Sequence, residues 1–303
     1  MTAGRAVAAP AGALRLWLIA ARPRTLPAAI APVLVGTALA GTEGVFRPLA
    51  FVCALLGSVF IQIGTNLSND YSDARRGADT EDRLGPVRVT AGGLMPPKQV
   101  LVGTYVAFGI AVAAGAYLIA IAGWQLLVVG AASILAGVLY TGGPRPYGYE
   151  GLGELFVFLF FGVVAVVGSY YVQTENLEWV AFALSVPVGL LVSAILVVNN
   201  VRDIETDRRA GKRTLAVRLG RERARPLFAA MVGVAFVVPV AVWLGGGLSA
   251  WLLLTLAAFP LVPPLVRTVY TRSDGPSLNR ALADTGRLVA VFSLLLAAGE
   301  LLS

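Results

Sequence analysis

The sequence has no histidine, a single cysteine, and charged side chains at only 14% of its 303 residues. Without histidine there is no imidazole to act as general base or metal ligand, which leaves carboxylates, amides, tyrosine, lysine and arginine for any chemistry. The lone cysteine, Cys53, excludes an intrachain disulfide. With 57% hydrophobic residues and a mean hydropathy of +0.77, this is not the composition of a soluble domain.

Apolar segments of membrane-spanning length recur along the whole chain. Nine spans are predicted, at about residues 26–42, 49–69, 100–121, 124–141, 154–172, 179–200, 227–245, 249–266 and 287–302. Several are rich in glycine and alanine, which lets helices approach closely in a membrane. The sequence therefore predicts an all-α integral membrane protein. We also expect a flexible tail over residues 1–14 and a short interfacial helix over residues 13–20.

Lysine and arginine gather in alternate loops of this topology. With the N-terminus inside, all of the 24 Lys and Arg except Arg47 fall on the inner side. The positive-inside rule then predicts a cytoplasmic N-terminus and an odd number of spans. The net charge of +7 follows from this orientation and from attraction to anionic lipid, so nucleic acid is not an expected partner. No linker divides the chain, which predicts one transmembrane domain over residues 1–303.

Asparagine and aspartate cluster where two of the apolar segments end. The first cluster, Asn66-Leu-Ser-Asn-Asp-Tyr-Ser-Asp73, places Asn69 and Asp73 one helical turn apart if the helix persists. Such oxygen ligands suit Mg²⁺, which keeps positions open for phosphate. Gly77 would let the following loop fold back and bring Asp79 toward the same site. The alternative interpretation is a solvated capping segment, because Asp and Asn are common at helix ends.

The second cluster, Asn199-Asn-Val-Arg-Asp-Ile-Glu-Thr-Asp207, forms a stripe with the spacing i, i+4, i+8 on one helical face. Its two leading asparagines directly follow an apolar run, where an unpaired amide is costly. Basic residues come next, at Arg208, Arg209, Lys212 and Arg213. They could neutralise the carboxylates as plain salt bridges, or bind the oxygens of a diphosphate and stabilise it as it leaves.

The two clusters are also related to each other. Asn69 and Asp73 align with Asn199 and Asp203 at an offset of 130 residues, which predicts two related halves that face one another. Carboxylates at the mouth of a membrane bundle are costly, so we expect them to be functional. We predict that both clusters line one cavity and hold Mg²⁺ against a diphosphate. The predicted metal ligands are Asp73, Asp79, Asp203 and Asp207.

Four segments carry a resemblance to a known family. They are Arg22-Pro-Arg-Thr-Leu-Pro27, Asn69-Asp-Tyr-Ser-Asp73 with Gly77 and Asp79, Tyr140-Thr-Gly-Gly-Pro-Arg-Pro-Tyr-Gly-Tyr-Glu-Gly-Leu-Gly153, and Asn200-Val-Arg-Asp-Ile-Glu-Thr-Asp207 followed by Gly211-Lys-Arg-Thr-Leu215. On these segments the chain resembles the UbiA superfamily of intramembrane aromatic prenyltransferases. Within it, the chain is most similar to the 1,4-dihydroxy-2-naphthoate polyprenyltransferases of menaquinone synthesis. Many superfamily members carry an aspartate at the position of Gly77, and the departure argues against 4-hydroxybenzoate prenylation.

The resemblance implies nine transmembrane helices around a central cavity, in a bacterial cell membrane, with the site open to the cytoplasm. It implies transfer of a polyprenyl group from polyprenyl diphosphate to 1,4-dihydroxy-2-naphthoate with loss of CO₂, giving demethylmenaquinone. Mg²⁺ would be the cofactor, and the hydrocarbon tail would run into membrane lipid. The expected catalytic residues are Asp73, Asp203, Asp207 and Lys212. The expected substrate-binding residues are Asn69, Arg88, Asn199, Asn200, Arg213, Tyr140, Arg145, Tyr147 and Tyr149.

The segment from Tyr140 to Gly153 is the candidate for holding the aromatic acceptor. Arg145 would pair with its carboxylate, and the tyrosines would stack on the ring or favour a cation. The alternative is a Gly/Pro-rich cytoplasmic turn with interfacial tyrosines. Two other functions stay open: prenyl transfer to another aromatic acceptor, and cation-coupled secondary transport. A transporter should carry charge near the bilayer midplane, whereas the acidic residues here gather at helix ends.

Overall fold

The structure is a computed structural model that describes residues 12–78 and 84–303. All secondary-structure elements of the described chain are helices: α1 (Ala13–Ala21), η1 (Pro23–Thr25), α2 (Leu26–Thr42), α3 (Pro48–Arg75), α4 (Pro97–Ala122), α5 (Gln125–Leu139), η2 (Tyr147–Glu150), α6 (Gly153–Val157), η3 (Phe158–Val164), α7 (Ala165–Thr174), α8 (Trp179–Arg209), α9 (Leu215–Leu219), α10 (Arg221–Leu244), η4 (Ala250–Leu261), α11 (Val262–Thr271) and α12 (Gly275–Leu301). Within the described residues, eight segments are long and apolar enough to span a membrane, and α5 is a shorter apolar helix. The all-α membrane fold is confirmed, and the predicted count of nine holds when α5 is included.

Several helices run further than hydropathy predicts. α3 continues to Arg75 and α8 to Arg209, so both Asn/Asp clusters lie on helices. α12 begins at Gly275, well before the predicted start at residue 287. Hydropathy marks only the apolar part of a helix, whereas the backbone hydrogen bonds continue into the polar region. Proline in the first turn fixes the starts of α3 and α4, where its missing N–H costs nothing.

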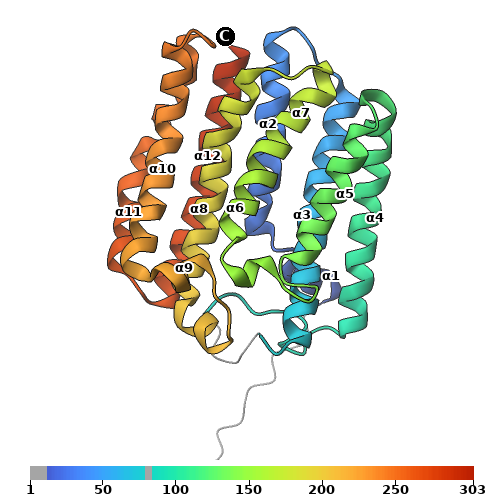
Figure 1. Ribbon diagram of the computed structural model, residues 1–303, viewed down its shortest axis with the longest axis vertical. Coiled ribbons are helices and arrows are strands. Elements are labelled where there is room, and N and C mark those ends of the chain that lie inside the picture. The colour runs from blue at the N-terminus through green and yellow to red at the C-terminus, as the bar shows by residue number, and fades with distance from the viewer. Residues whose placement is uncertain (1–11, 79–83) are drawn as a thin grey trace, which may run out of the picture.

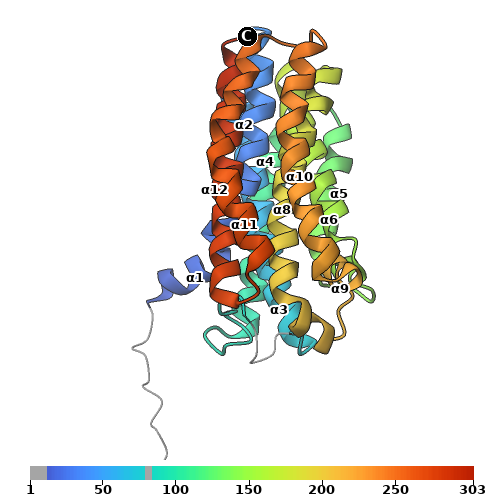
Figure 2. The ribbon, with the colours of Figure 1, turned by 90° about the vertical axis from the view of Figure 1, so that its left-hand side faces the viewer.

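The spans stand nearly parallel to the long axis of the molecule (Figures 1 and 2). α8 packs against α10, α12 and η3, and its residues Leu184, Val188 and Leu191 are fully buried. α3 packs against α4, α5 and α2. The long connections after α3 and after α8 both lie at the lower end in Figure 1, as does α1, whereas the C-terminus lies at the upper end. An odd number of crossings follows, as the basic residues predict.

Large apolar side chains cover the outward faces of the spans. On α4, for example, Val102, Tyr105, Val106 and Val112 are all exposed. A continuous apolar exterior on helices of this length is stable only in lipid. The chain is therefore a multi-pass membrane protein.

α1 lies outside the bundle at its lower end (Figure 2). Its residues Leu14, Trp17 and Leu18 are exposed, which gives the apolar face expected of an interfacial helix. The predicted flexible tail is partly corrected, because Ala13 and Leu14 already belong to α1. Residues 1–11 lie outside the described residues.

Candidate active site

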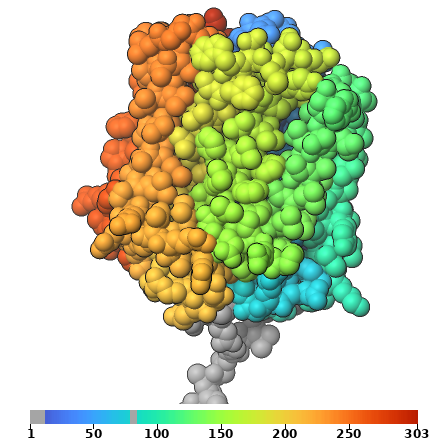
Figure 3. Space-filling view, viewed as in Figure 1, coloured from blue at the N-terminus to red at the C-terminus, as the bar shows by residue number. Residues whose placement is uncertain are grey.

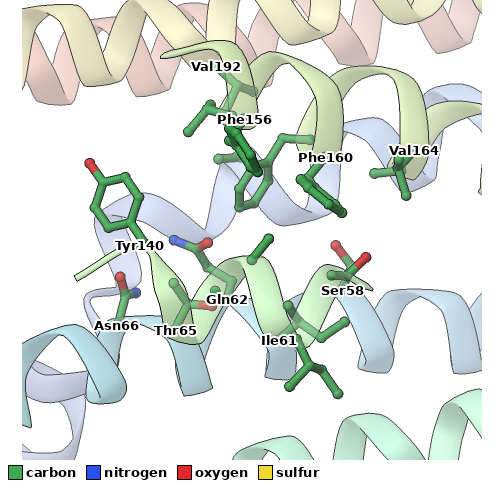
Figure 4. A pocket seen from close by; sticks show the side chains of 18 of the residues that line it. Ser58, Ile61, Gln62, Thr65, Asn66, Tyr140, Phe156, Phe160, Val164 and Val192 are labelled. Atoms are coloured by element: carbon green, nitrogen blue, oxygen red, sulfur yellow. The ribbon is translucent and has the colours of Figure 1, made fainter. Parts of the chain in front are cut away.

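A cavity of about 810 Å³ lies inside the bundle. Both Asn/Asp clusters reach it, because Asp73 of α3 and Asp207 of α8 line its lower end. Above them the walls become apolar. In Figure 4, Phe156 and Phe160 point into the space from the α6 and η3 side, and Gln62 of α3 lies on the opposite wall. A polar mouth with an apolar interior suits a ligand that has one charged end and one hydrocarbon end.

α3 and α8 end in the same backbone motif. In α3 the carbonyl of Asp73 accepts the N–H of Ala78, and the intervening Gly77 has a φ of 65°. In α8 the carbonyl of Asp207 accepts the N–H of Lys212, and the intervening Gly211 has a φ of 74°. A left-handed glycine with these bonds is a Schellman motif, which satisfies carbonyls that the helix end would leave unpaired. Asp73 and Asp207 therefore hold the same position in the last turn of their helices.

The two helix ends also allow another alignment of the clusters. If the glycine-closed ends are superposed, Asp73 corresponds to Asp207 and Asn69 to Asp203, which is an offset of 134 residues. This differs from the predicted offset of 130 by about one helical turn. Both clusters are rich in asparagine and aspartate at helical spacing, so their letters alone allow either alignment.

The carboxylate of Asp73 is the point where the segments at this end of the cavity converge. The Tyr149 hydroxyl donates to its Oδ1 at 2.6 Å. Arg88 Nη2 and Lys212 Nζ lie 3.3 and 3.8 Å from its Oδ2. The N–H of Arg213 donates to the Tyr149 carbonyl at 2.7 Å. Because these bonds join the chain after α8 to the end of α3, the two clusters face one shared chamber, as predicted.

Asp70, unlike Asp73, is bound by backbone N–H groups. Its two oxygens accept the N–H groups of Val89 and Thr90 at 3.0 and 2.9 Å. These buried bonds hold the connection after α3 and so fix the backbone from which Arg88 reaches Asp73. Asn69 is fixed in turn by the Thr141 hydroxyl, which donates to its Oδ1 at 2.9 Å.

Asp203 lines the cavity within a tight ionic contact. Arg202 donates from Nε to Oδ1 at 2.8 Å and from Nη2 to Oδ2 at 2.5 Å. The same guanidinium donates to Asn199 Oδ1 at 2.8 Å and to Asn279 Oδ1, on α12, at 2.6 Å. Arg202 is 1% exposed, so its charge is compensated inside the protein. Asp203 therefore has a structural partner, and removing it would leave a buried cation.

We expect Arg202→Met to destabilise the protein by about 3 kcal/mol or more, because Asp203 would stay buried without its partner. The matched control is Arg208→Met on the same helix. Arg208 pairs with Glu205 at 3.1 Å, but both side chains are more than half exposed, and such pairs contribute little. Thermal unfolding in detergent should show a large fall in melting temperature for the first variant alone. Equal shifts in the two variants would contradict this role of Arg202.

The remaining predicted residues divide into two groups. Asn200 lines the cavity and donates to Glu154 Oε1 at 2.8 Å, and Tyr140 and Tyr147 also line it. The Tyr147 hydroxyl donates to the Ala136 carbonyl at 2.8 Å, and burial raises the pKa of this phenol, which stays neutral. The second group does not reach the cavity: Arg145 and Arg213 are exposed and absent from its lining. Asp79 lies outside the described residues.

Sequence reasoning missed three side chains that hold the site together. These are Arg202, Thr141 and Glu154. A signal existed for two of them, because an arginine shortly after an apolar run and a glutamate at the start of an apolar span each need a partner when buried. Thr141 carries no such signal, since a threonine in a turn is ordinary.

The donor set can be compared with what Mg²⁺ requires. Among the described residues, no group of three acidic, histidine or cysteine side chains is close enough to enclose an ion. Mg²⁺ is usually held by one or two carboxylates together with water and substrate phosphate. Asp73, Asp207 and Asn69 supply hard oxygen atoms to the same cavity. The residues therefore fit a magnesium ion that a phosphate ligand completes.

Known proteins resemble this chain along nearly its whole length. Residues 29–294 match the UbiA prenyltransferase family. A 1,4-dihydroxy-2-naphthoate octaprenyltransferase of Mycobacterium tuberculosis is 42% identical over 281 residues, 93% of this chain and 95% of that protein. The Escherichia coli enzyme of the same description is 38% identical over 293 residues, 95% of each chain. A solved UbiA homolog from Archaeoglobus fulgidus, bound to GPP and Mg²⁺, has a similar fold, with a TM-score of 0.64 at 15% identity over 93% of this chain and 99% of that one.

Proposed function

The chain belongs to the UbiA prenyltransferase family, and from this premise we infer that it is a 1,4-dihydroxy-2-naphthoate polyprenyltransferase. The matches to relatives of that description cover almost the whole of this chain and almost the whole of each relative. The observation that supports this function in the molecule is the cavity with aspartates at one end and apolar walls at the other. A transporter would not need two aspartate-bearing helix ends beside an apolar chamber.

We propose that the diphosphate of the donor binds between the ends of α3 and α8. Asp73 and Asp207 would hold Mg²⁺, with Asn69 as a further oxygen donor and Asp203 beside them. When bound, Mg²⁺ withdraws charge from the phosphate oxygens and makes diphosphate a better leaving group. Arg88 and Lys212, which lie at Asp73, are placed to contact the remaining oxygens of the diphosphate.

The reaction breaks the bond between the allylic carbon and the diphosphate oxygen, and the electron pair leaves with the diphosphate. Arg88 and Lys212 stabilise that growing negative charge. The naphthoate carbon that carries the carboxylate attacks the allylic cation, and the carboxylate departs as CO₂. Its electron pair restores the aromatic ring, so the product of this redox-neutral reaction is the quinol, demethylmenaquinol. Its conversion to demethylmenaquinone is a separate two-electron oxidation by another oxidant. The apolar wall excludes water, which would otherwise capture the cation as an alcohol.

The acceptor would lie between the tyrosines of the segment 140–153 and the polar face of α3. Tyr140 and Tyr147 are in edge-to-face contact, with ring centroids 5.5 Å apart, and Tyr147 stacks on Phe156 at 4.1 Å. This aromatic group can hold a naphthalene ring and favour the nearby cation. For the carboxylate we propose Arg22, which lines the cavity at the junction of α1 and η1, in place of the exposed Arg145.

We further propose that the aspartate end faces the cytoplasm and that residues 1–303 act as one domain. The basic residues support this orientation, because they concentrate in the connections at that end. Both halves contribute aspartates to one cavity, which supports a single functional unit.

A panel of acceptors tests the function directly. Purified protein supplied with Mg²⁺ and a polyprenyl diphosphate should release CO₂ from carboxyl-labelled 1,4-dihydroxy-2-naphthoate and form a prenylated quinol. With 4-hydroxybenzoate we expect turnover at least tenfold lower, because its single ring fills less of the apolar chamber. Transfer to another acceptor, with none to the naphthoate, would keep the family and overturn the substrate.

A further inference from the structure

Glycines along the cavity form two physically different sets. In the first set a side chain would collide with a neighbouring element: a Cβ at Gly36 would meet the Val166 carbonyl, and one at Gly162 would meet Gly189. These glycines allow helices to pack closely. In the second set, an added Cβ would meet nothing within 4 Å. Its cavity-lining members are Gly57, Gly115, Gly130 and Gly168. Close packing of helices does not account for them.

The four open glycines come from four different spans, α3, α4, α5 and α7. Hydrogen bonds place the ends of these spans at one level: Arg47, just before α3, donates to Gln173 near the end of α7, and Tyr171 of α7 donates to Ala122 at the end of α4. α5 starts directly after the short turn that follows Ala122. Each glycine lies five to nine residues from that end of its own helix, which places it about 8 to 14 Å into the bundle. They therefore form one belt around the cavity.

The belt is far from the charged end of the site. Asp73 lies sixteen positions after Gly57 on α3, which corresponds to about 24 Å along the helix. Beside the belt the cavity reaches the surface, because its lining includes the exposed side chains of Leu127 and Leu135 on α5. Figure 3 shows the surface hollowed between α5 and the α6 to α7 span. A ligand anchored at Asp73 reaches this region only if it has a long tail.

We propose that Gly57, Gly115, Gly130 and Gly168 are specificity-determining residues that keep the cavity wide enough for long polyprenyl tails. This inference rests on the proposed function and deepens it. A bare helix backbone on four sides leaves room for a branched isoprenoid chain, whose methyl groups need more width than a straight alkyl chain. Any larger side chain in the belt would extend into that space, since no neighbouring atom diverts it. A short donor such as geranyl diphosphate ends before the belt and is unaffected.

The test compares long and short donors in Gly115→Leu, in Gly168→Leu and in the double variant. The matched control is Gly109→Leu, six residues from Gly115 on α4, where a Cβ also meets nothing within 4 Å but the position is exposed and outside the cavity lining. Leucine is a better helix former than glycine, so these variants should fold. The measurement is the dissociation constant, in the presence of Mg²⁺, of octaprenyl and of geranyl diphosphate, followed by turnover with each.

We expect each cavity variant to weaken octaprenyl diphosphate binding at least tenfold relative to geranyl diphosphate, and the double variant more, while Gly109→Leu keeps the wild-type ratio. An unchanged ratio in the cavity variants, in a protein whose wild type binds both donors, would overturn the belt alone. A wild type that binds neither donor would overturn the proposed function and the belt with it. A ratio that also falls in Gly109→Leu would assign the effect to the helix rather than to the cavity, which overturns the inference.

Discussion

Asp73→Asn and Asp207→Asn should each lower kcat by about 10³-fold or more, because each removes a negative charge from the site proposed for the metal and diphosphate. Asparagine keeps the size of the side chain. In Asp73→Asn, the Tyr149 hydroxyl can still donate to the remaining oxygen, so its local packing should persist. Turnover of naphthoate with saturating donor and Mg²⁺ is the measurement.

A charge-neutralising control is available on the same helix as Asp207. Glu205 lies two residues earlier, is exposed, and pairs only with the arginines Arg208 and Arg221 among the contacts described for it. Glu205→Gln should keep turnover within about twofold of wild type, because surface pairs contribute little. Near-normal turnover in Asp73→Asn or Asp207→Asn would remove that residue from the catalytic site, whatever the control shows.

Asp203 should respond differently from its two counterparts. Asp203→Ala would lose activity and also lower stability, because Arg202 would remain buried with its charge uncompensated. Loss of activity in this variant alone therefore says little about metal binding. The network around Arg202 also involves α12 through Asn279, so disturbing it would affect the packing of two spans.

Removal of divalent metal should stop turnover completely, and added Mg²⁺ should restore it. A second measurement does not depend on turnover: inorganic pyrophosphate should raise the melting temperature of the protein only when Mg²⁺ is present. At a ligand concentration of 100 times the dissociation constant, the expected stabilisation is about 2.7 kcal/mol. The physical reason is that two carboxylates facing a bare diphosphate would repel it, whereas a cation between them makes the contact favourable.

Asp207→Asn serves as the control for that binding measurement. It should lose most of the pyrophosphate-dependent shift, while Glu205→Gln keeps it. Turnover that continues in the presence of excess chelator would contradict the metal role. A full shift with pyrophosphate in metal-free protein would do the same, and would assign the phosphate to Arg88 and Lys212 alone.

The sequence determined the membrane fold, the odd number of crossings and the location of the two Asn/Asp-rich helix ends. These features depend on local composition and spacing, since a helix must be apolar where it faces lipid and satisfies its own backbone hydrogen bonds. The Asn/Asp clusters could be identified from the sequence because polar side chains beside apolar segments are costly to bury and therefore uncommon. Basic residues near the helix ends likewise indicated an odd number of crossings.

Only the tertiary structure decided which of these groups meet. It matched Asp73 with Asp207 through glycine-closed helix ends, bound Asp203 to Arg202, assigned Asp70 to the backbone of Val89 and Thr90, and left Arg145 at the surface. Each depends on contacts between residues distant in the chain, or on where a turn directs a side chain. The spacing of residues within one helix does not reveal such contacts. The open glycines belong to the same class, because whether a glycine faces a neighbour or an empty cavity is settled only when the helices have packed.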